Sequence, residues 1–214
     1  MAKRPVFIAN VSISGFVEEK EIDFTWFPGL SLSQKQKSIK SLHDAFNKDY
    51  PDFKVLEISS KSLETTGVEL SAFNLILSHQ NKIVSVETAF QSSKVFDLGG
   101  PYLDLLNNSA REAKTDERLK SSGKLIYFCF HGQKWSLEPK TAFYDWLYLN
   151  AVYHNIELTN KIMEYSAFSD IEFNPKKSIN CQARSAALFV SLKRTGLLEK
   201  VINKTEEFLK IYSV

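Results

Sequence analysis

The sequence predicts an α+β fold that is mostly α-helical, in a single domain with a small strand-containing layer at the N-terminus. Strand-like alternation is concentrated early in the chain, whereas apolar residues at helical spacing dominate later. Hydrophobic residues make up 43% of the 214 residues and aromatic residues 13%, which is enough to build one sizeable core. These observations together favour one compact unit.

The N-terminal layer is predicted from two alternating segments. Residues 5–14 and 22–26 alternate as strands do. Gly15 follows the first segment and Phe27-Pro28-Gly29 the second, and both are typical of turns. Because residues 5–14 alternate, they do not resemble the continuous apolar run of a signal peptide.

A helix and a further strand complete this layer. Apolar residues within 33–48 lie near helical spacing, which predicts an amphipathic helix. Residues 53–58 alternate as a strand, and 59–67 are polar and read as a loop.

The following elements are predicted from capping patterns. Ser85 is placed to cap a helix that carries Glu87 and continues to the breaker sequence Gly99-Gly100-Pro101. Ser109 and Glu112 have the spacing of a capping box at the start of another helix.

The last part of the chain predicts one strand and then helices. Residues 125–131 form an apolar run short enough for a strand, with a turn at Gly132. Pro139 is expected at the first helical position of a helix over 141–154. Further helices are predicted near 157–165, over 178–195 before Gly196, and at the C-terminus.

Composition and spacing exclude several classes of protein. Cys129 and Cys181 are isolated, so we expect reduced thiols, a cytoplasmic protein and no disulfide. None of the four histidines stands at ligand spacing from a cysteine or another histidine, so no metal and no cofactor is predicted. No Gly-rich phosphate-binding motif occurs, and no apolar run approaches the ~20 residues of a membrane span. The net charge of +2 is neutral with respect to nucleic-acid binding.

A polar stripe is the first candidate for function. Glu87, Gln91 and Lys94 stand at i, i+4 and i+7, which places them on one helix face. A carboxylate, an amide and an ammonium together can hold a charged ligand that contains a sugar. The alternative is structural, since Glu87 would complement the helix dipole and the other two would lie on a solvated face.

Several sequence blocks resemble one known superfamily. The Ser71-Ala72-Phe73-Asn74 turn is followed by Val86-Glu87 with Gln91 and Lys94 at V-E-x-x-x-Q-x-x-K spacing. Later blocks fit in the same order, namely Ala110-Arg111-Glu112-Ala113-Lys114, Tyr144-Asp145-Trp146, Ser169-Asp170-Ile171-Glu172-Phe173 and Ser178 to Ala183. The chain thus resembles the NADAR (YbiA-like) N-glycosidase superfamily from about Val68 to Arg194. Two departures are Ile171-Glu172-Phe173 in place of the usual Trp-Gly pair and Asn74 one place late.

The N-terminal segments point to one branch of that superfamily. Residues 4–7, 27–29, 34–39 and 56–62 resemble the antitoxins that accompany DarT-type DNA ADP-ribosyltransferase toxins. The resemblance implies a glycosidase that removes ADP-ribose from guanine bases in DNA, with the toxin as functional partner, ADP-ribose as product and no role for a membrane. It also implies a core over 67–214 with residues 1–66 packed on it.

The resemblance assigns two catalytic carboxylates. Glu87 is expected to stabilise the positive charge that develops on the anomeric carbon. Asp170 is expected to orient water or to bind sugar hydroxyls. The alternative for Asp170 is an Asx-turn or helix-cap role.

The remaining candidates would bind the substrate. Gln91 and Lys94 suit ribose hydroxyls and a diphosphate oxygen. Ser71, Phe73 and Asn74 can cradle phosphate or ribose, with Phe73 against a base, or they form an ordinary turn with Phe73 in the core.

Four further residues are candidates for substrate binding. Lys61 can bind phosphate from its polar loop, although such a loop often has no ligand. Trp146 can stack on a base, or it belongs to the buried stripe of its helix. Asn180 and Gln182 can contact the ligand through their amides.

Two other functions fit the same residues. One is an N-glycosidase acting on a small ribosylated metabolite, and the other is an antitoxin that binds ADP-ribose without catalysis.

Overall fold

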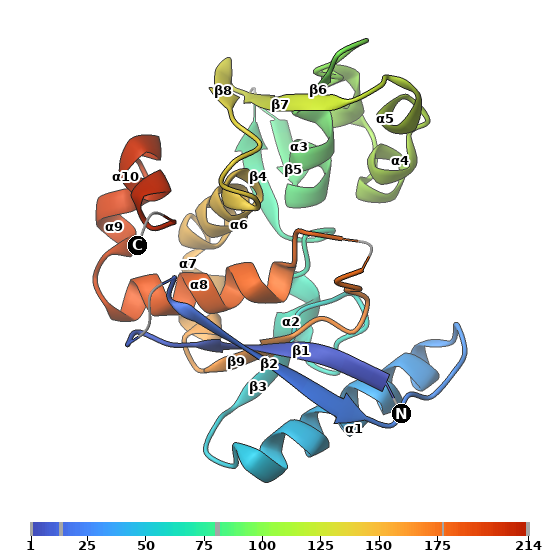
Figure 1. The fold of residues 1–214 in the computed structure, drawn as a ribbon, viewed down its shortest axis with the longest axis vertical. Helices are drawn as coiled ribbons and strands as arrows, with labels where there is room; N and C mark the ends of the chain where they lie inside the picture. The colour runs from blue at the N-terminus through green and yellow to red at the C-terminus, as the bar shows by residue number, and fades with distance from the viewer. Residues whose placement is uncertain (1, 13–14, 80–81, 177, 213–214) are drawn as a thin grey trace.

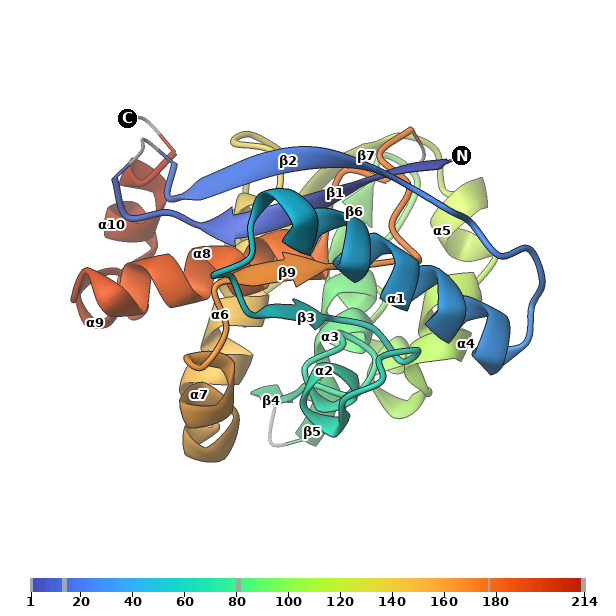
Figure 2. The ribbon, with the colours of Figure 1, turned by 90° about the horizontal axis from the view of Figure 1, so that it is seen from below.

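The computed structural model describes residues 2–12, 15–79, 82–176 and 178–212 (Figure 1). Its largest sheet has the strand order β2-β1-β9-β3. β1 (Ala2–Ala9) pairs antiparallel with β2 (Val17–Phe24) and with β9 (Ala167–Ser169), and β3 (Val55–Glu57) runs parallel to β9. Thus a strand from the C-terminal part of the chain lies between two strands of the first 66 residues (Figure 2).

The alternation along β1 explains how the sheet is covered. Val6 and Ile8 pack in one buried cluster with residues of α1 (Leu32–Asp49). Phe7 and Ala9 point to the opposite face and join the main core with residues of α8 (Gln182–Arg194). The sheet therefore lies between α1 and α8, as Figure 1 shows.

Two smaller sheets lie on the far side of the main core. β6 (Lys94–Phe96), β7 (Leu125–Phe130) and β8 (Gln133–Trp135) form an antiparallel sheet, and β4 (Ile76–His79) and β5 (Lys82–Ser85) form a hairpin. The remaining helices are α2 (Thr65–Glu69), α3 (Val86–Ser92), the 3-10 helix η1 (Leu103–Asn107), α4 (Ala110–Thr115), α5 (Arg118–Ser121), α6 (Ala142–Tyr153), α7 (Ile156–Ile162), α9 (Leu198–Val201) and α10 (Thr205–Lys210).

The predicted α+β class is confirmed, and so are two predicted helix starts. The Ser85 hydroxyl accepts from the Thr88 amide at the start of α3. Ser109 and Glu112 form a complete capping box at the start of α4. Predicted strand 5–14 is found as Ala2–Ala9, and its residues 13–14 lie outside the described residues.

Three predicted helix boundaries were wrong. The helix of Glu87 ends at Ser92 instead of Gly99, because the residues from Lys94 to Phe96 pair with β7 as strand β6. Pro139 does not begin α6, because Thr141 adopts a left-handed φ of 69° that breaks the helical path before Ala142. The helix predicted from residue 178 begins at Gln182, since Cys181 before it is extended.

No helix within the described ranges is both long enough and apolar enough to cross a bilayer.

Candidate functional site

A cleft of about 760 Å³ lies among α3, the β6-β7-β8 sheet and loops that leave the largest sheet. Its walls come from loops after β3 and α2, from α3, β6, α4 and β7, from the start of α6 and the loop before it, and from the loop between β9 and α8 with the first residue of α8. Of the residues predicted from sequence, the cleft brings together Lys61, Ser71, Phe73, Glu87, Gln91, Lys94, Asp170, Asn180 and Gln182.

Glu87 lies in the first turn of α3 and is only 5% exposed. Its Oε1 accepts a hydrogen bond from Gln91 Nε2 at 2.8 Å, and Lys114 Nζ lies 3.5 Å from the same oxygen. The Glu87 amide donates to the Ala72 carbonyl at 2.9 Å, which fixes the start of the helix against the Ser71–Phe73 loop. The carboxylate is therefore held through Oε1, and the helix that carries it is fixed by the backbone.

Gln91 uses its amide nitrogen to bind Glu87. The side chain is 6% exposed, and its Oε1 is buried without a hydrogen-bond partner among the described residues. A buried carbonyl oxygen without a donor is costly, and a ligand hydroxyl or amino group can supply that donor.

Lys94 lines the same cleft although it is not on the helix. It begins β6, where its Nζ lies 4.9 Å from the centre of the Phe90 ring. Burial, with a smaller contribution from Lys114 and opposed by Glu87, lowers the pKa of Lys94 to about 8. A partly desolvated ammonium of this kind gains from an anionic ligand.

Asp170 follows β9 and is 7% exposed. Its Oδ1 accepts from the Glu172 and Phe173 amides at 3.0 and 3.2 Å, and its Oδ2 accepts from Gln182 Nε2 at 2.9 Å. Burial, followed by the charge of Glu57, raises the pKa of Asp170 to about 8. The carboxyl thus organises its own turn and also faces the cleft.

The backbone of one residue, Ala72, connects the segments that carry the two carboxyls. The Ala72 amide donates to Gln182 Oε1 at 2.7 Å, and Gln182 holds Asp170. The Ala72 carbonyl accepts from the Glu87 amide. The positions of Glu87 and Asp170 are therefore coupled through the backbone of Ala72.

Asn74 and Trp146 do not line the cleft. Asn74 Nδ2 donates to the Val68 carbonyl at 2.9 Å and to Ser71 Oγ at 3.1 Å, so it supports the turn. Trp146 Nε1 donates to the Ile202 carbonyl at 3.1 Å, and its ring packs 5.0 Å from that of Trp135.

Several cleft residues were missed by the reasoning from sequence. Lys114 and Tyr144 stand inside blocks that carried the resemblance, so a signal for them existed. Burial, followed by the charge of Glu87 and smaller effects that include Asp170, raises the pKa of Tyr144 far above its usual value. The apolar floor gave no such signal, because its aromatic residues look like ordinary core, namely Phe90, Phe128 and Phe143.

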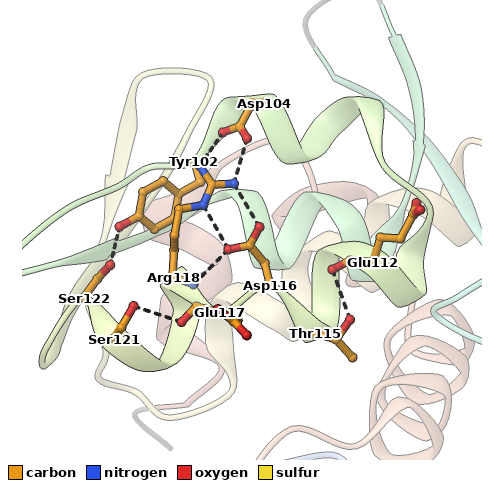
Figure 3. A network of polar contacts seen from close by, with 9 residues as sticks. All are labelled: Tyr102, Asp104, Glu112, Thr115, Asp116, Glu117, Arg118, Ser121 and Ser122. Carbon is orange, nitrogen blue, oxygen red and sulfur yellow. Dashed lines mark hydrogen bonds and ion pairs between the residues drawn. The ribbon is translucent and has the colours of Figure 1, made fainter.

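A polar network supports the segment that carries Lys114 (Figure 3). Arg118 pairs with Asp104 at 2.7 Å and with Asp116 at 2.9 Å, and its guanidinium lies 4.5 Å from the centre of the Tyr102 ring. Tyr102 in turn contacts Ser122. These contacts join η1 and α5 to the end of α4, the helix whose Lys114 lines the cleft.

No cluster of three or more His, Cys, Asp or Glu side chains that could hold a metal ion is found in the described part of the chain. A search of curated proteins finds no match to this chain. A family model described as the DarT1-associated NADAR antitoxin matches residues 2–214. The resemblance seen in the sequence is thereby confirmed, and the chain belongs to the family of DarT1-associated NADAR antitoxins.

Proposed function

We propose that this protein is an N-glycosidase that removes ADP-ribose from guanine bases in DNA. The observation that carries the proposal is one cleft in which two buried carboxyls, Glu87 and Asp170, face the same space as several lysines. Such a set fits a substrate with an anionic diphosphate and a reactive sugar carbon between two bases.

Glu87 is proposed to stabilise the reacting sugar. Breaking an N-glycosidic bond leaves positive charge on the anomeric carbon, and a nearby carboxylate in a desolvated site stabilises that charge. Gln91 Nε2 fixes the carboxylate, so little reorganisation is needed during the reaction. Oε1 of Gln91, which has no partner among the residues that the structure describes, is proposed to accept from a ribose hydroxyl.

The lysines are proposed to bind the diphosphate. Lys61, Lys94, Lys114 and Lys140 all line the cleft. Lysine binds phosphate as a compact point charge, and a diphosphate also relieves the unfavourable burial of Lys94.

The aromatic floor is proposed to receive a base. Phe90, Phe128 and Phe143 lie close together, with the rings of Phe128 and Phe143 stacked at 4.7 Å. Stacking on an aromatic face is worth ~1–3 kcal/mol per base. A guanine in duplex DNA must first leave the stack at a cost of a few kcal/mol, so single-stranded DNA should react faster.

The reaction is completed by water bound near Asp170, which attacks the sugar and releases ADP-ribose. The family description names a DarT1 association, and we propose that a DarT1-type toxin is the functional partner whose modification is reversed.

The test is release of free ADP-ribose from DNA that carries ADP-ribosylated guanine. We expect release by the wild type and a loss of about 10²–10³-fold in the Glu87→Gln variant, because the charge is removed and the shape is kept. Glu164→Gln, which removes an exposed carboxylate outside the cleft, should react like the wild type.

The outcomes separate the alternatives. Release from a small ADP-ribosyl guanosine but not from DNA would assign a metabolite as substrate. Tight binding of ADP-ribose without any release would assign an antitoxin that acts by binding alone.

A further inference from the structure

A second buried carboxyl belongs to Glu57, whose side chain binds the residues on either side of Asp170. Glu57, at the end of β3, is 2% exposed. Its Oε1 accepts from the Ile171 amide at 2.8 Å and from Ser59 Oγ at 2.7 Å, and its Oε2 accepts from Ser169 Oγ. Glu57 therefore binds the two residues that flank Asp170, and fixes the backbone on both sides of it.

No cation in the described residues forms an ion pair with either Glu57 or Asp170. Lys35 approaches from α1, but it pairs with Glu172 at 2.9 Å. His43, also on α1, contacts Ser169 Oγ at 2.9 Å, and burial lowers its pKa to about 4, so it is neutral at pH 7.

Burial raises the pKa of Glu57, and the charge of Glu172 adds to this effect. The buried neighbours on α6 and before α8 are neutral. Burial is the main cause that raises the pKa values of Tyr144 and Tyr148 on α6 and of Cys181 before α8 far above their usual values. Two buried carboxyls without a cation do not both ionise easily, and they then titrate as a pair.

The hydrogen bonds allow a proton to reside on either carboxyl. The hydroxyls of Ser59 and Ser169 can rotate, so each can donate to an ionised Glu57 or accept from a protonated one. Asp170 accepts three N–H groups, which leaves about one of its four acceptor positions free, on Oδ2. Of the two, Asp170 is the one that lines the cleft.

We propose that Glu57 is a positioning residue that shares one proton with Asp170, so that Asp170 acts as the proton donor to the departing base. This role rests on the function proposed above. As the C–N bond breaks, its electron pair stays on the base nitrogen, which takes the proton from Asp170. Water then attacks the sugar carbon and returns a proton to the Asp170 carboxylate. The sum is hydrolysis to ADP-ribose and the unmodified base.

The raised pKa of both carboxyls supports this assignment. For Asp170 the causes are burial and then Glu57, and for Glu57 the largest cause is burial. In catalytic carboxyl pairs, burial and a neighbouring acid likewise raise the pKa of one carboxyl, which then keeps its proton near neutral pH.

The experiment follows the carboxyl signal of Asp170 by ¹³C NMR in protein labelled at aspartate, with Asp170→Asn used to assign the signal. In the wild type we expect a titration step near pH 8. In Glu57→Gln, which keeps an oxygen acceptor for Ile171, the step should move at least about one pH unit lower. Glu164→Gln makes the same charge change on the surface and should leave the step unmoved.

The same variants are then assayed for release of ADP-ribose against pH. The rate of ADP-ribose release by the wild type should fall as pH rises through the titration step of Asp170. In Glu57→Gln this fall should occur at lower pH. At pH 7.5 the rate should be reduced at least about tenfold, with a larger change in kcat than in KM. A variant that had only lost stability would not shift the pH profile.

The results that overturn the inference are specific. An Asp170 signal that titrates near pH 4 in the folded wild type excludes the shared proton, even if Glu57→Gln does not fold. An unchanged pH profile in a folded Glu57→Gln excludes the donor role. Absence of release by the wild type overturns the proposed function and the donor role with it, while the NMR titration still decides whether the pair shares a proton.

Discussion

Gln91 holds Glu87 from one helical turn away, with Nε2 of the amide 2.8 Å from Oε1 of the carboxylate. Both side chains are buried in the wall of the cleft, and the other end of the Gln91 amide has no partner among the described residues. A structural pair would be expected to satisfy both ends of the amide. The arrangement is better explained by a site that reserves one acceptor for its ligand.

Replacing Gln91 by Met therefore separates function from stability. We expect kcat/KM for ADP-ribose release to fall about 10–100-fold, because Glu87 loses the donor that orients it and the ligand loses an acceptor. The free energy of unfolding in urea should fall by less than about 1.5 kcal/mol, since the lost hydrogen bond to Glu87 is partly offset by removal of a buried unpartnered oxygen. Gln133→Met, at an exposed glutamine, serves as the matched control and should retain full activity. A loss of stability without a loss of activity would assign Gln91 to the core alone.

The sequence predicted which residues line the cleft better than it predicted which helices and strands carry them. Glu87, Gln91 and Lys94 were placed on one helix, but α3 ends at Ser92 and Lys94 begins β6. After residue 92 the chain forms a strand instead of continuing the helix, because it pairs with β7, which is distant in sequence. The spacing of apolar residues within one segment cannot predict such a contact.

Trp146 shows a second limit of prediction from sequence, which concerns the role of a residue instead of its position. An aromatic residue on an amphipathic helix looks the same whether its ring meets a ligand or a neighbouring helix. Only the hydrogen bond to the Ile202 carbonyl shows that this indole is used inside the protein. For Asp170, the predicted turn role and a position in the cleft are compatible, because its carboxyl forms an Asx-type turn and also lines the cleft.

Trp146→Phe should reduce stability and leave catalysis intact. The variant loses the hydrogen bond to Ile202 and part of the packing against Trp135, so the free energy of unfolding should fall by about 1–3 kcal/mol. Its kcat and KM should match the wild type. Tyr144→Phe, two residues earlier on the same helix but lining the cleft, should show a reduced kcat with little change in stability. If Trp146→Phe instead raised KM without loss of stability, the result would support a base-stacking role for Trp146.

His43 should make folding sensitive to acid. Burial lowers its folded-state pKa from 6.5 to about 4, so the neutral form stabilises the fold fully above pH 6.5, and this stabilisation is lost as pH falls from 6.5 toward 4. The difference in unfolding free energy between wild type and His43→Gln should thus shrink by about 1–2 kcal/mol between pH 7 and pH 4.5. His154→Gln, at an exposed histidine, serves as the matched control for the substitution itself. A difference for His43→Gln that stays constant with pH would mean that His43 is not desolvated in solution.

We expect the charge of Lys94 to destabilise the free protein and to strengthen ligand binding. Because burial lowers the folded-state pKa of this lysine to about 8, its charge opposes folding at pH 7, and the opposition is relieved as pH rises through 8. Lys94→Met keeps the apolar contact with Phe90 and removes the charge, so the free energy of unfolding at pH 7 should rise by roughly 1–2 kcal/mol.

The same substitution should weaken binding of ADP-ribose, which calorimetry can measure, by about 10–100-fold, since hydrogen bonds to charged groups contribute ~1.5–3 kcal/mol. Lys120→Met, at an exposed lysine on α5, should change neither quantity. Raised stability with unchanged affinity would show that the diphosphate lies elsewhere in the cleft, near Lys61 or Lys140. Lowered stability would show that Lys94 pairs with Glu87 in solution. A residue that destabilises the free protein and binds the ligand is best explained by selection for the bound state, because removing its charge would otherwise improve the fold at no cost.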